Sequence, residues 1–261
     1  MKKKGSPYIF FTTIPVMSLL FLPVLSLLLK ISPDVFISSL RDYNICQAIL
    51  LTLSTSSLSV LLIFLLGTPL AYLMAWKNFR GKRFFSVLID LPSVLPPAVA
   101  GLALLIAFGR RSFSGTLFDT LGIEIAFTPI AVILAQMFVS SPYYIKSAMN
   151  GFSMIPADLI EAAEIDGASE WKAFKDIILP LSRRSIVNGI LLSWARAVGE
   201  FGATIIFAGN YPGRTQTMSL AVYLGLQGDL NKAITLAVIL LVISFIILFT
   251  ANKNLFSYEL R

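Results

Sequence analysis

The chain has 261 residues, of which 56% are apolar and 13% are charged, and its mean hydropathy is +0.81. Soluble domains are about 45–50% apolar and about 25% charged, so this composition excludes a water-soluble globule. Histidine is absent and Cys46 is the single cysteine, which excludes Ser-His-Asp and Cys-His nucleophilic sites, His-ligated or Cys-rich metal sites and an internal disulfide.

Six hydrophobic stretches predict an all-α integral membrane protein with six transmembrane helices in one domain, residues 1–261, because about 20 apolar residues span a bilayer as a helix. The first stretch follows Lys2, Lys3 and Lys4, as in a signal peptide. Its apolar part is longer than the ~7–15 residues of a signal core and lacks a small-x-small cleavage pattern, so we expect it to be retained. The stretches cover residues 8–29, 45–75, 84–108, 126–148, 186–208 and 232–250.

Lys and Arg are distributed unevenly over the connections between these stretches. If the N-terminus is inside, the inner connections hold more than twice as many of them as the outer ones. This asymmetry predicts a multi-pass protein of the cell membrane with both termini in the cytoplasm. It also accounts for the formal net charge of +7, so we expect no nucleic-acid partner. A dedicated patch for anionic lipid or nucleic acid is the alternative.

Prolines interrupt the third stretch. Pro92, Pro96 and Pro97 each lack an amide donor, so this helix must kink or break. Irregular backbone at membrane depth persists only where protein or a water-filled cavity satisfies it. We expect these prolines to line a translocation pathway or its gate, and a purely structural kink is the alternative.

The fifth stretch combines small residues with charged ones. Small side chains recur every four positions from Ala195 to Ala203 and allow a neighbouring helix to approach closely. Arg196, Glu200 and Thr204 recur at the same spacing and predict a polar face on which the first two form an ion pair. The pair either lies beside the pathway, where it shapes the field for an anion, or only fixes helix packing.

The longest inner connection contains a segment, residues 156–180, that predicts two short helices. Pro156 and the acidic residues after it suit the start of the first helix, and Gly167 can supply the left-handed turn that ends it. Ser169 can cap a second helix, which Pro180 is expected to terminate. An apolar edge on this helix suits docking into a groove on a partner, and a self-packed surface loop is the alternative. That edge consists of Trp171, Phe174, Ile177 and Ile178.

The same segment resembles the EAA motif of ABC-type importer permeases. The matching pattern is Glu161-Ala162-Ala163, three residues, Gly167, nine residues, then Ile177-x-Leu179-Pro180. In this family the segment forms the coupling helices that insert into a cytoplasmic ATPase subunit. The resemblance implies that the coupling residues are Glu161, Ala162, Ala163, Gly167, Ala168, Ser169, Trp171 and Phe174.

The resemblance also implies the partners of the chain. The sequence has no GxxxxGK[ST] loop, so ATP and Mg would be bound by a separate ATPase chain, and this chain would be a transport subunit without a cofactor or metal. An importer needs two coupling segments and this chain has one, which implies a homodimer. The complex would contain two ATPase subunits and an extracytoplasmic oxyanion-binding protein, and it would work by alternating access.

Three further segments look like the molybdate permease branch of this family. They are residues 91–97, 199–204 and 209–218. Tungstate and sulfate/thiosulfate permeases share much of this framework and remain alternatives, although Gly199 stands where sulfate permeases commonly have an arginine. We find no cluster of donors inside the membrane able to hold a tetrahedral dianion tightly, so we expect the binding protein to select the substrate.

The outer connection, residues 209–231, contains a lone cation, Arg214. It either contacts an acidic group of the binding protein, or steers the oxyanion, or is simply solvated. Two other classes of protein fit less well. A secondary transporter would show inverted repeats, which we do not find. An intramembrane enzyme would need convergent acid, base or metal groups, and only Arg196 and Glu200 lie clearly within the spans.

Overall fold

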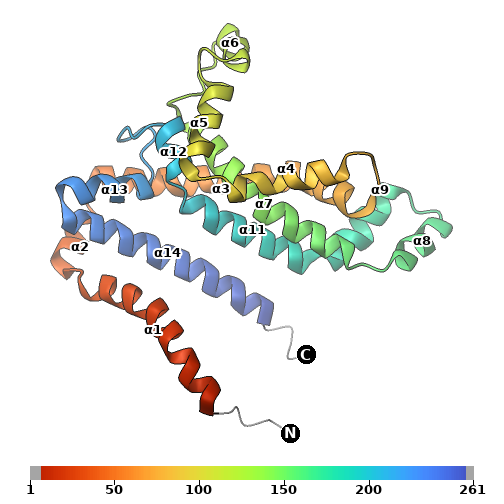
Figure 1. The fold of residues 1–261 in the computed structure, drawn as a ribbon, viewed down its shortest axis with the longest axis horizontal. Coiled ribbons are helices and arrows are strands. Elements are labelled where there is room, and N and C mark those ends of the chain that lie inside the picture. The colour runs from red at the N-terminus through yellow and green to blue at the C-terminus, as the bar shows by residue number, and fades with distance from the viewer. Residues whose placement is uncertain (1–6, 257–261) are drawn as a thin grey trace.

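The computed structural model describes residues 7–256, which form helices and connections without a strand (Figure 1). Lys2, Lys3 and Lys4 and the last five residues lie outside this range, so the orientation of the termini stays a prediction. In chain order the elements are α1 (Pro7–Leu29), α2 (Pro33–Ser39), α3 (Tyr43–Trp76), α4 (Lys82–Val94), α5 (Pro97–Phe108), α6 (Phe113–Thr120), α7 (Pro129–Ser153), α8 (Ala157–Ile165), α9 (Glu170–Ala173), the π-helical η1 (Phe174–Ile178), α10 (Leu179–Leu181), α11 (Arg183–Val198), α12 (Gly202–Phe207), α13 (Met218–Gly228) and α14 (Leu230–Phe256).

The centre of the bundle is formed by α3, α7 and α11, which pack along one another. Hydroxyl side chains on α3 form hydrogen bonds inside the bundle, within α3 and with α7 and α13. Thr52 Oγ1 donates to the Ala48 carbonyl at 2.7 Å and accepts from the Met218 N–H at 2.8 Å. The Thr68 and Tyr144 hydroxyls share a hydrogen bond of 2.5 Å between α3 and α7. The buried polar groups of these helices therefore pair with one another and stabilise the bundle, as expected where water is not available as a hydrogen-bond partner.

The number of membrane-crossing helices is only partly supported. Among the described residues, α1, α3 and α14 are long and apolar enough to cross a bilayer, and the bent pair α4–α5 is a fourth such segment if it counts as one span. The helix α7 is long enough, but its Gln, Ser, Tyr and Lys side chains lower its hydropathy. Six spans therefore remain a prediction.

The third and fifth hydrophobic stretches are each two helices. The axis turns by 116° between α4 and α5, at Leu95 and Pro96, as the prolines predicted. Pro92 does not break the helix, because α4 runs through this buried residue to Val94. In the fifth stretch α11 ends at Val198 and α12 begins at Gly202, a break that the sequence did not predict.

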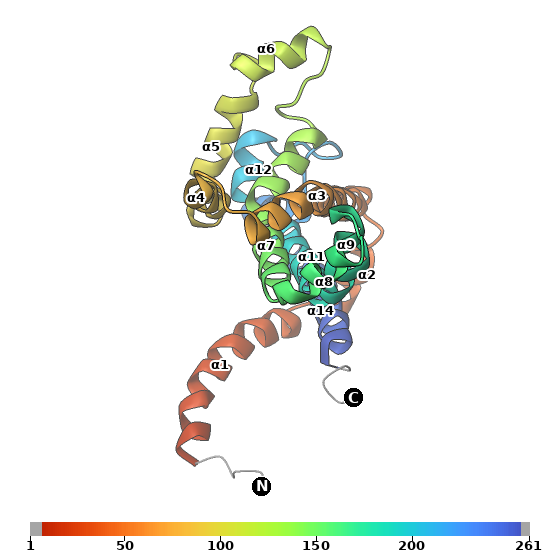
Figure 2. The same cartoon turned by 90° about the vertical axis from the view of Figure 1, so that its right-hand side faces the viewer.

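The helix α1 stands away from the rest of the bundle (Figure 2). Within its apolar window, Thr12–Leu29, no residue is buried, and its main neighbour in the chain is α14. An apolar helix exposed over these 18 residues is stable only against lipid or another protein surface.

Candidate functional site

The first part of the candidate site is the elbow of the coupling segment, at the end of the bundle where α8 and α9 lie (Figure 1). The helix α8 ends with Gly167 in the left-handed conformation, at φ +83°. The Gly167 N–H donates to the Glu164 carbonyl at 3.0 Å, and the Ala168 N–H donates to the Ala163 carbonyl at 2.9 Å. These two bonds form a Schellman motif, so the predicted left-handed turn is confirmed.

The second coupling helix starts as predicted and ends later than predicted. The Ser169 hydroxyl accepts the Lys172 N–H at 3.3 Å and caps α9. The helical path continues through η1 and α10 to Leu181, so Pro180 does not terminate it. In η1 the Leu179 N–H bonds back five residues to the Phe174 carbonyl, and this wider turn accommodates the proline ring that an α-helical turn would exclude.

Contacts from α3 and α7 hold the second coupling helix. The rings of Tyr72 and Phe174 meet edge to face at a centroid distance of 5.3 Å, and Phe152 lies 6.1 Å from Phe174. The Tyr72 hydroxyl donates to Glu170 Oε1 at 3.1 Å, and Lys77 Nζ lies 2.7 Å from the same oxygen. The ion pair with Lys77 and then the Tyr72 hydrogen bond lower the pKa of Glu170, and the pair raises the pKa of Lys77. We call Tyr72, Lys77, Glu170 and Phe174 together the α3 anchor. Both charges of its ion pair are kept at neutral pH.

Most of the remaining coupling residues are exposed. The Trp171 side chain is 71% exposed, and Glu161 and Ala162 are exposed as well. Ile165, which was not among the predicted coupling residues, is 86% exposed at the end of α8. Ala163 and Ala168 are half-buried at the elbow. Phe174 was predicted to meet a partner, but its ring packs half-buried against its own chain. The exposed apolar surface therefore belongs to α8 and to the start of α9.

The second part of the site is the junction where the two broken stretches meet. The helices α5 and α12 pack against each other directly after their breaks. Gly202 lies so close to Pro97 that a Cβ atom at Gly202 would collide with the Pro97 ring. A Cβ at Gly101 would lie 2.8 Å from the Ala203 carbonyl oxygen. Pro96 caps α5, so Pro96 and Pro97 belong to the junction, whereas Pro92 lies inside α4.

Charged residues hold the α11–α12 break. Arg196 Nη1 lies 2.7 Å from Glu200 Oε2, so the predicted ion pair is confirmed. Glu200 is 1% exposed, and its other oxygen accepts the Ala203 N–H at 2.8 Å, which caps the start of α12. Thr204 is fully buried in α12, and its hydroxyl has no hydrogen-bond partner in the described part of the chain. The prediction that Arg196, Glu200 and Thr204 share one continuous polar helix face was wrong, because the helix breaks between Arg196 and Thr204.

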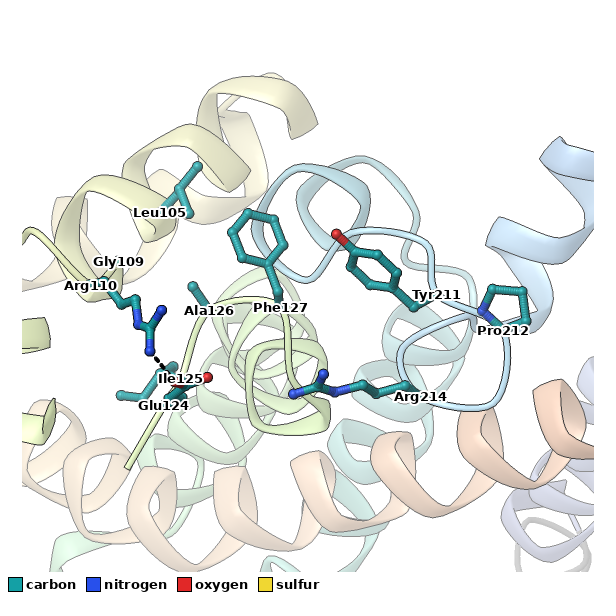
Figure 3. A pocket seen from close by; sticks show the side chains of 10 residues that line it. All are labelled: Leu105, Gly109, Arg110, Glu124, Ile125, Ala126, Phe127, Tyr211, Pro212 and Arg214. Carbon is teal, nitrogen blue, oxygen red and sulfur yellow. Dashed lines mark hydrogen bonds and ion pairs between the residues drawn. The ribbon is translucent and has the colours of Figure 1, made fainter. Parts of the chain in front are cut away.

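The third part is a pocket of 520 Å³ beside the loop after α12 (Figure 3). Arg214 points into it from that loop, with Tyr211 beside Phe127. Across the pocket, Arg110 and Glu124 form an ion pair. The sequence did not single out Arg110 or Glu124, because only the path of residues 109–128 brings them opposite Arg214.

Comparison with known proteins identifies relatives over most of the chain. The family model for the binding-protein-dependent transport system inner membrane component matches residues 67–259. "Molybdenum transport system permease protein ModB" of Mycobacterium tuberculosis is 37% identical over 226 residues, 87% of this chain and 86% of that protein. "Probable sulfate transport system permease protein cysT" of Chlorokybus atmophyticus is 34% identical over 242 residues, 90% and 83% of the two chains. A bacterial ABC transporter that imports alginate has a similar fold, with a TM-score of 0.73 at 20% identity over 95% of this chain and 91% of its own.

Proposed function

The chain belongs to the family of binding-protein-dependent transport system inner membrane components, as the permease subunit of an ABC importer, and from this premise we propose that it imports molybdate. As a permease subunit it is not itself an enzyme. The proposed importer contains two copies of this chain, two cytoplasmic ATPase subunits, which bind ATP and Mg²⁺, and an extracytoplasmic oxyanion-binding protein. Both termini of each copy would lie in the cytoplasm, and this chain would carry no cofactor.

The coupling segment is the observation that carries this proposal. Its elbow closes on its own hydrogen bonds, which fix the turn between α8 and α9. Its apolar side chains Ile165 and Trp171 are exposed, and such a surface suits the groove of a partner protein. One such segment per chain supports a dimer, since two ATPase subunits would each receive one. The exposed apolar length of α1 also supports a second copy as a neighbour in the membrane.

The geometry supports a direct mechanical route from the ATPase to the membrane helices. A displacement of the coupling segment would pull on the α3 anchor through Glu170, Tyr72 and Lys77. The helix α3 packs along α7, and α7 contacts both α11 and α12. The α5–α12 junction would then open or close the pathway, because its two broken helices pack against each other and against α7. Such a chain transmits force and gates a path without covalent chemistry.

Molybdate is the substrate that the relatives favour, with tungstate and sulfate or thiosulfate as alternatives. The molybdenum permease resembles this chain over 87% of its length, but a sulfate permease matches at 34% identity, so the membrane framework alone separates these oxyanions poorly. We expect selection to reside in the binding protein, and calorimetry of that protein with molybdate, tungstate and sulfate tests the assignment.

Reconstitution tests the transport function. Vesicles that contain this chain, its ATPase and its binding protein should take up radiolabelled molybdate only when ATP is supplied on the ATPase side. An ATPase variant that lacks the phosphate-loop lysine is the matched control and should abolish uptake. Uptake by the chain alone, driven by an ion gradient, would overturn the proposal and indicate a secondary transporter.

A further inference from the structure

A polar groove runs between α4, α7 and α11, toward the end of the bundle that carries the coupling segment. The helix α7 packs against both α4 and α11 and forms the floor of the groove. The groove holds a pocket of 550 Å³, within the usual size of a ligand site. Its polar lining consists of Ser93, Tyr143, Lys146, Ser147, Asn150 and Asn188.

These side chains are unsuited to contact with lipid. The Lys146 side chain is 51% exposed in the isolated chain, and the amides of Asn150 and Asn188 have no hydrogen-bond partner in the described part of the chain. A charged group and unpaired amides are expensive in hydrocarbon, so helices of a membrane protein turn such faces toward a water-filled path or toward protein. The groove therefore has the character of a pathway wall.

The groove offers hydrogen-bond donors of the kind that an oxyanion accepts. Lys146 provides an ammonium group, Asn150 and Asn188 provide amide N–H groups, and Tyr143 provides a phenol. The two serines do not contribute protons, because Ser93 Oγ donates to the Asp90 carbonyl and Ser147 Oγ donates to the Ser185 carbonyl, each at 2.7 Å. A cationic donor with neutral donors around it matches the oxygens of a tetrahedral anion.

A carboxylate limits how tightly this groove can hold an anion. Asp90 Oδ1 lies 2.6 Å from Lys146 Nζ, so the net charge of the pair is zero until an anion displaces Asp90. Asn188, Leu192 and Arg196 follow one another every four residues on α11, so Arg196 lies on the same face, about 12 Å nearer the junction. The ion pair at the α11–α12 break thus lies near the side of α11 that lines the pocket, beyond the lining residues Asn188 and Leu192.

We propose that this groove is a transient subsite for the transported oxyanion, in which Lys146 exchanges Asp90 for the anion before release. The inference rests on the proposed function and adds to it a place where the substrate binds this chain. Competition by Asp90 keeps the binding weak, and weak binding allows the anion to leave. Because the donors come from α7 and α11 and the competing carboxylate comes from α4, the sequence did not reveal them as a group.

Two variants with opposite expected signs test the subsite. The permease–ATPase complex, without its binding protein, is placed in phosphatidylcholine nanodiscs, and equilibrium binding of radiolabelled molybdate is measured. Lys146→Gln should weaken binding about tenfold or more, because it removes a charge-assisted donor. Asp90→Asn should instead tighten binding in the nanodiscs. In vesicles that also contain the binding protein, it should slow ATP-driven uptake at saturating substrate. Lys82→Gln is the matched control, since it removes the same charge at the start of α4 without reaching the groove.

The results distinguish a substrate subsite from a structural ion pair and from a lipid site. If both variants weaken binding, or neither changes it, Asp90 and Lys146 form a structural ion pair and the proposal is wrong. If the complex binds phosphatidylglycerol through Lys146 but no molybdate, the groove is a lipid headgroup site and the proposal is again wrong. Even if one of these results rules out the subsite, the proposed transport function is retained as long as the unmodified complex, with its binding protein in vesicles, shows ATP-driven uptake. Absence of that uptake would overturn the function itself.

Discussion

The coupling elbow and the α5–α12 junction hold their shapes in opposite ways. The elbow closes within six residues, through hydrogen bonds from Gly167 to Glu164 and from Ala168 to Ala163. The junction joins residues about a hundred positions apart, and its parts meet only because Gly101 and Gly202 leave room for the facing backbone. The elbow is thus shaped by neighbouring residues, whereas the junction is shaped by the packing of two distant helices. Substitutions should therefore act locally at the elbow and on the whole bundle at the junction.

Loss of Arg196 should have the largest effect. Arg196→Met leaves the buried Glu200 carboxylate without its partner, and such a loss typically costs about 3–5 kcal/mol. The double variant with Glu200→Gln removes the unpaired charge and should recover much of the loss. Thermal unfolding of the purified permease in detergent measures both. Equal destabilisation by the single and double variants would show that the pair does not determine the stability of the junction.

A larger side chain at the junction should come next. Gly202→Val forces a Cβ atom into Pro97, and overpacking of this kind costs about 1–3 kcal/mol. Gly199→Ala is the matched control, because a Cβ there meets only the Ala195 carbonyl at 3.6 Å. We expect the first variant to lower the unfolding temperature and uptake, and the control to change neither. A stable, active Gly202→Val protein would contradict the close packing of α5 on α12.

Substitutions of Gly167 at the elbow should act through the backbone conformation alone. A Cβ at Gly167 meets nothing within 4 Å, so Gly167→Val acts only through the positive φ, at a cost of about 1–2 kcal/mol. Gly167→Asn should be milder, because asparagine tolerates this conformation. The prediction is loss of ATPase association and of uptake for the valine variant, with an unchanged bundle by unfolding. Normal association would show that the elbow is not the coupling element.

The α3 anchor should affect coupling more than stability. Charge reversal by Glu170→Lys or by Lys77→Glu breaks the ion pair, and the two together restore it in the opposite sense. We expect each single variant to reduce the uptake per ATP hydrolysed, and the double variant to recover it. The lowered pKa of Glu170 keeps the pair intact at neutral pH, and the contact should be lost only as pH falls through that pKa. Failure of the double variant to recover would assign the two residues separate roles.

Arg214→Ala should have the smallest effect. An exposed charge contact is worth about 0.2–1 kcal/mol, and salt screens it. If Arg214 contacts the binding protein or the oxyanion in the outer pocket, uptake at low substrate should fall, and the defect should shrink as ionic strength rises. Arg111→Ala, next to Arg110 in the chain but outside the pocket lining, is the control. Uptake equal to that of the unmodified protein at every salt concentration would leave Arg214 as a solvated residue.

The sequence predicted the elbow better than the membrane helices. Gly167, the Ser169 cap and the break at Pro96 follow from rules that involve only neighbouring residues, and the structure agrees with each. The expected end at Pro180 failed, because a π-helical turn accommodates it, and α4 continues as a helix through Pro92. The break after Val198 carries no local signal, since Gly199 and Gly202 are both compatible with a membrane helix.

By itself, the sequence determined the class of protein, the charge asymmetry and the elbow at Gly167, because hydropathy, charge and backbone preference are properties of single residues and their near neighbours. Tertiary structure decided which helices break, which polar groups face one another and where cavities form. The α5–α12 junction, the outer pocket and the groove around Lys146 each combine residues from distant segments. Their geometry depends on close packing between helices, and packing is set by the shapes of both surfaces at once.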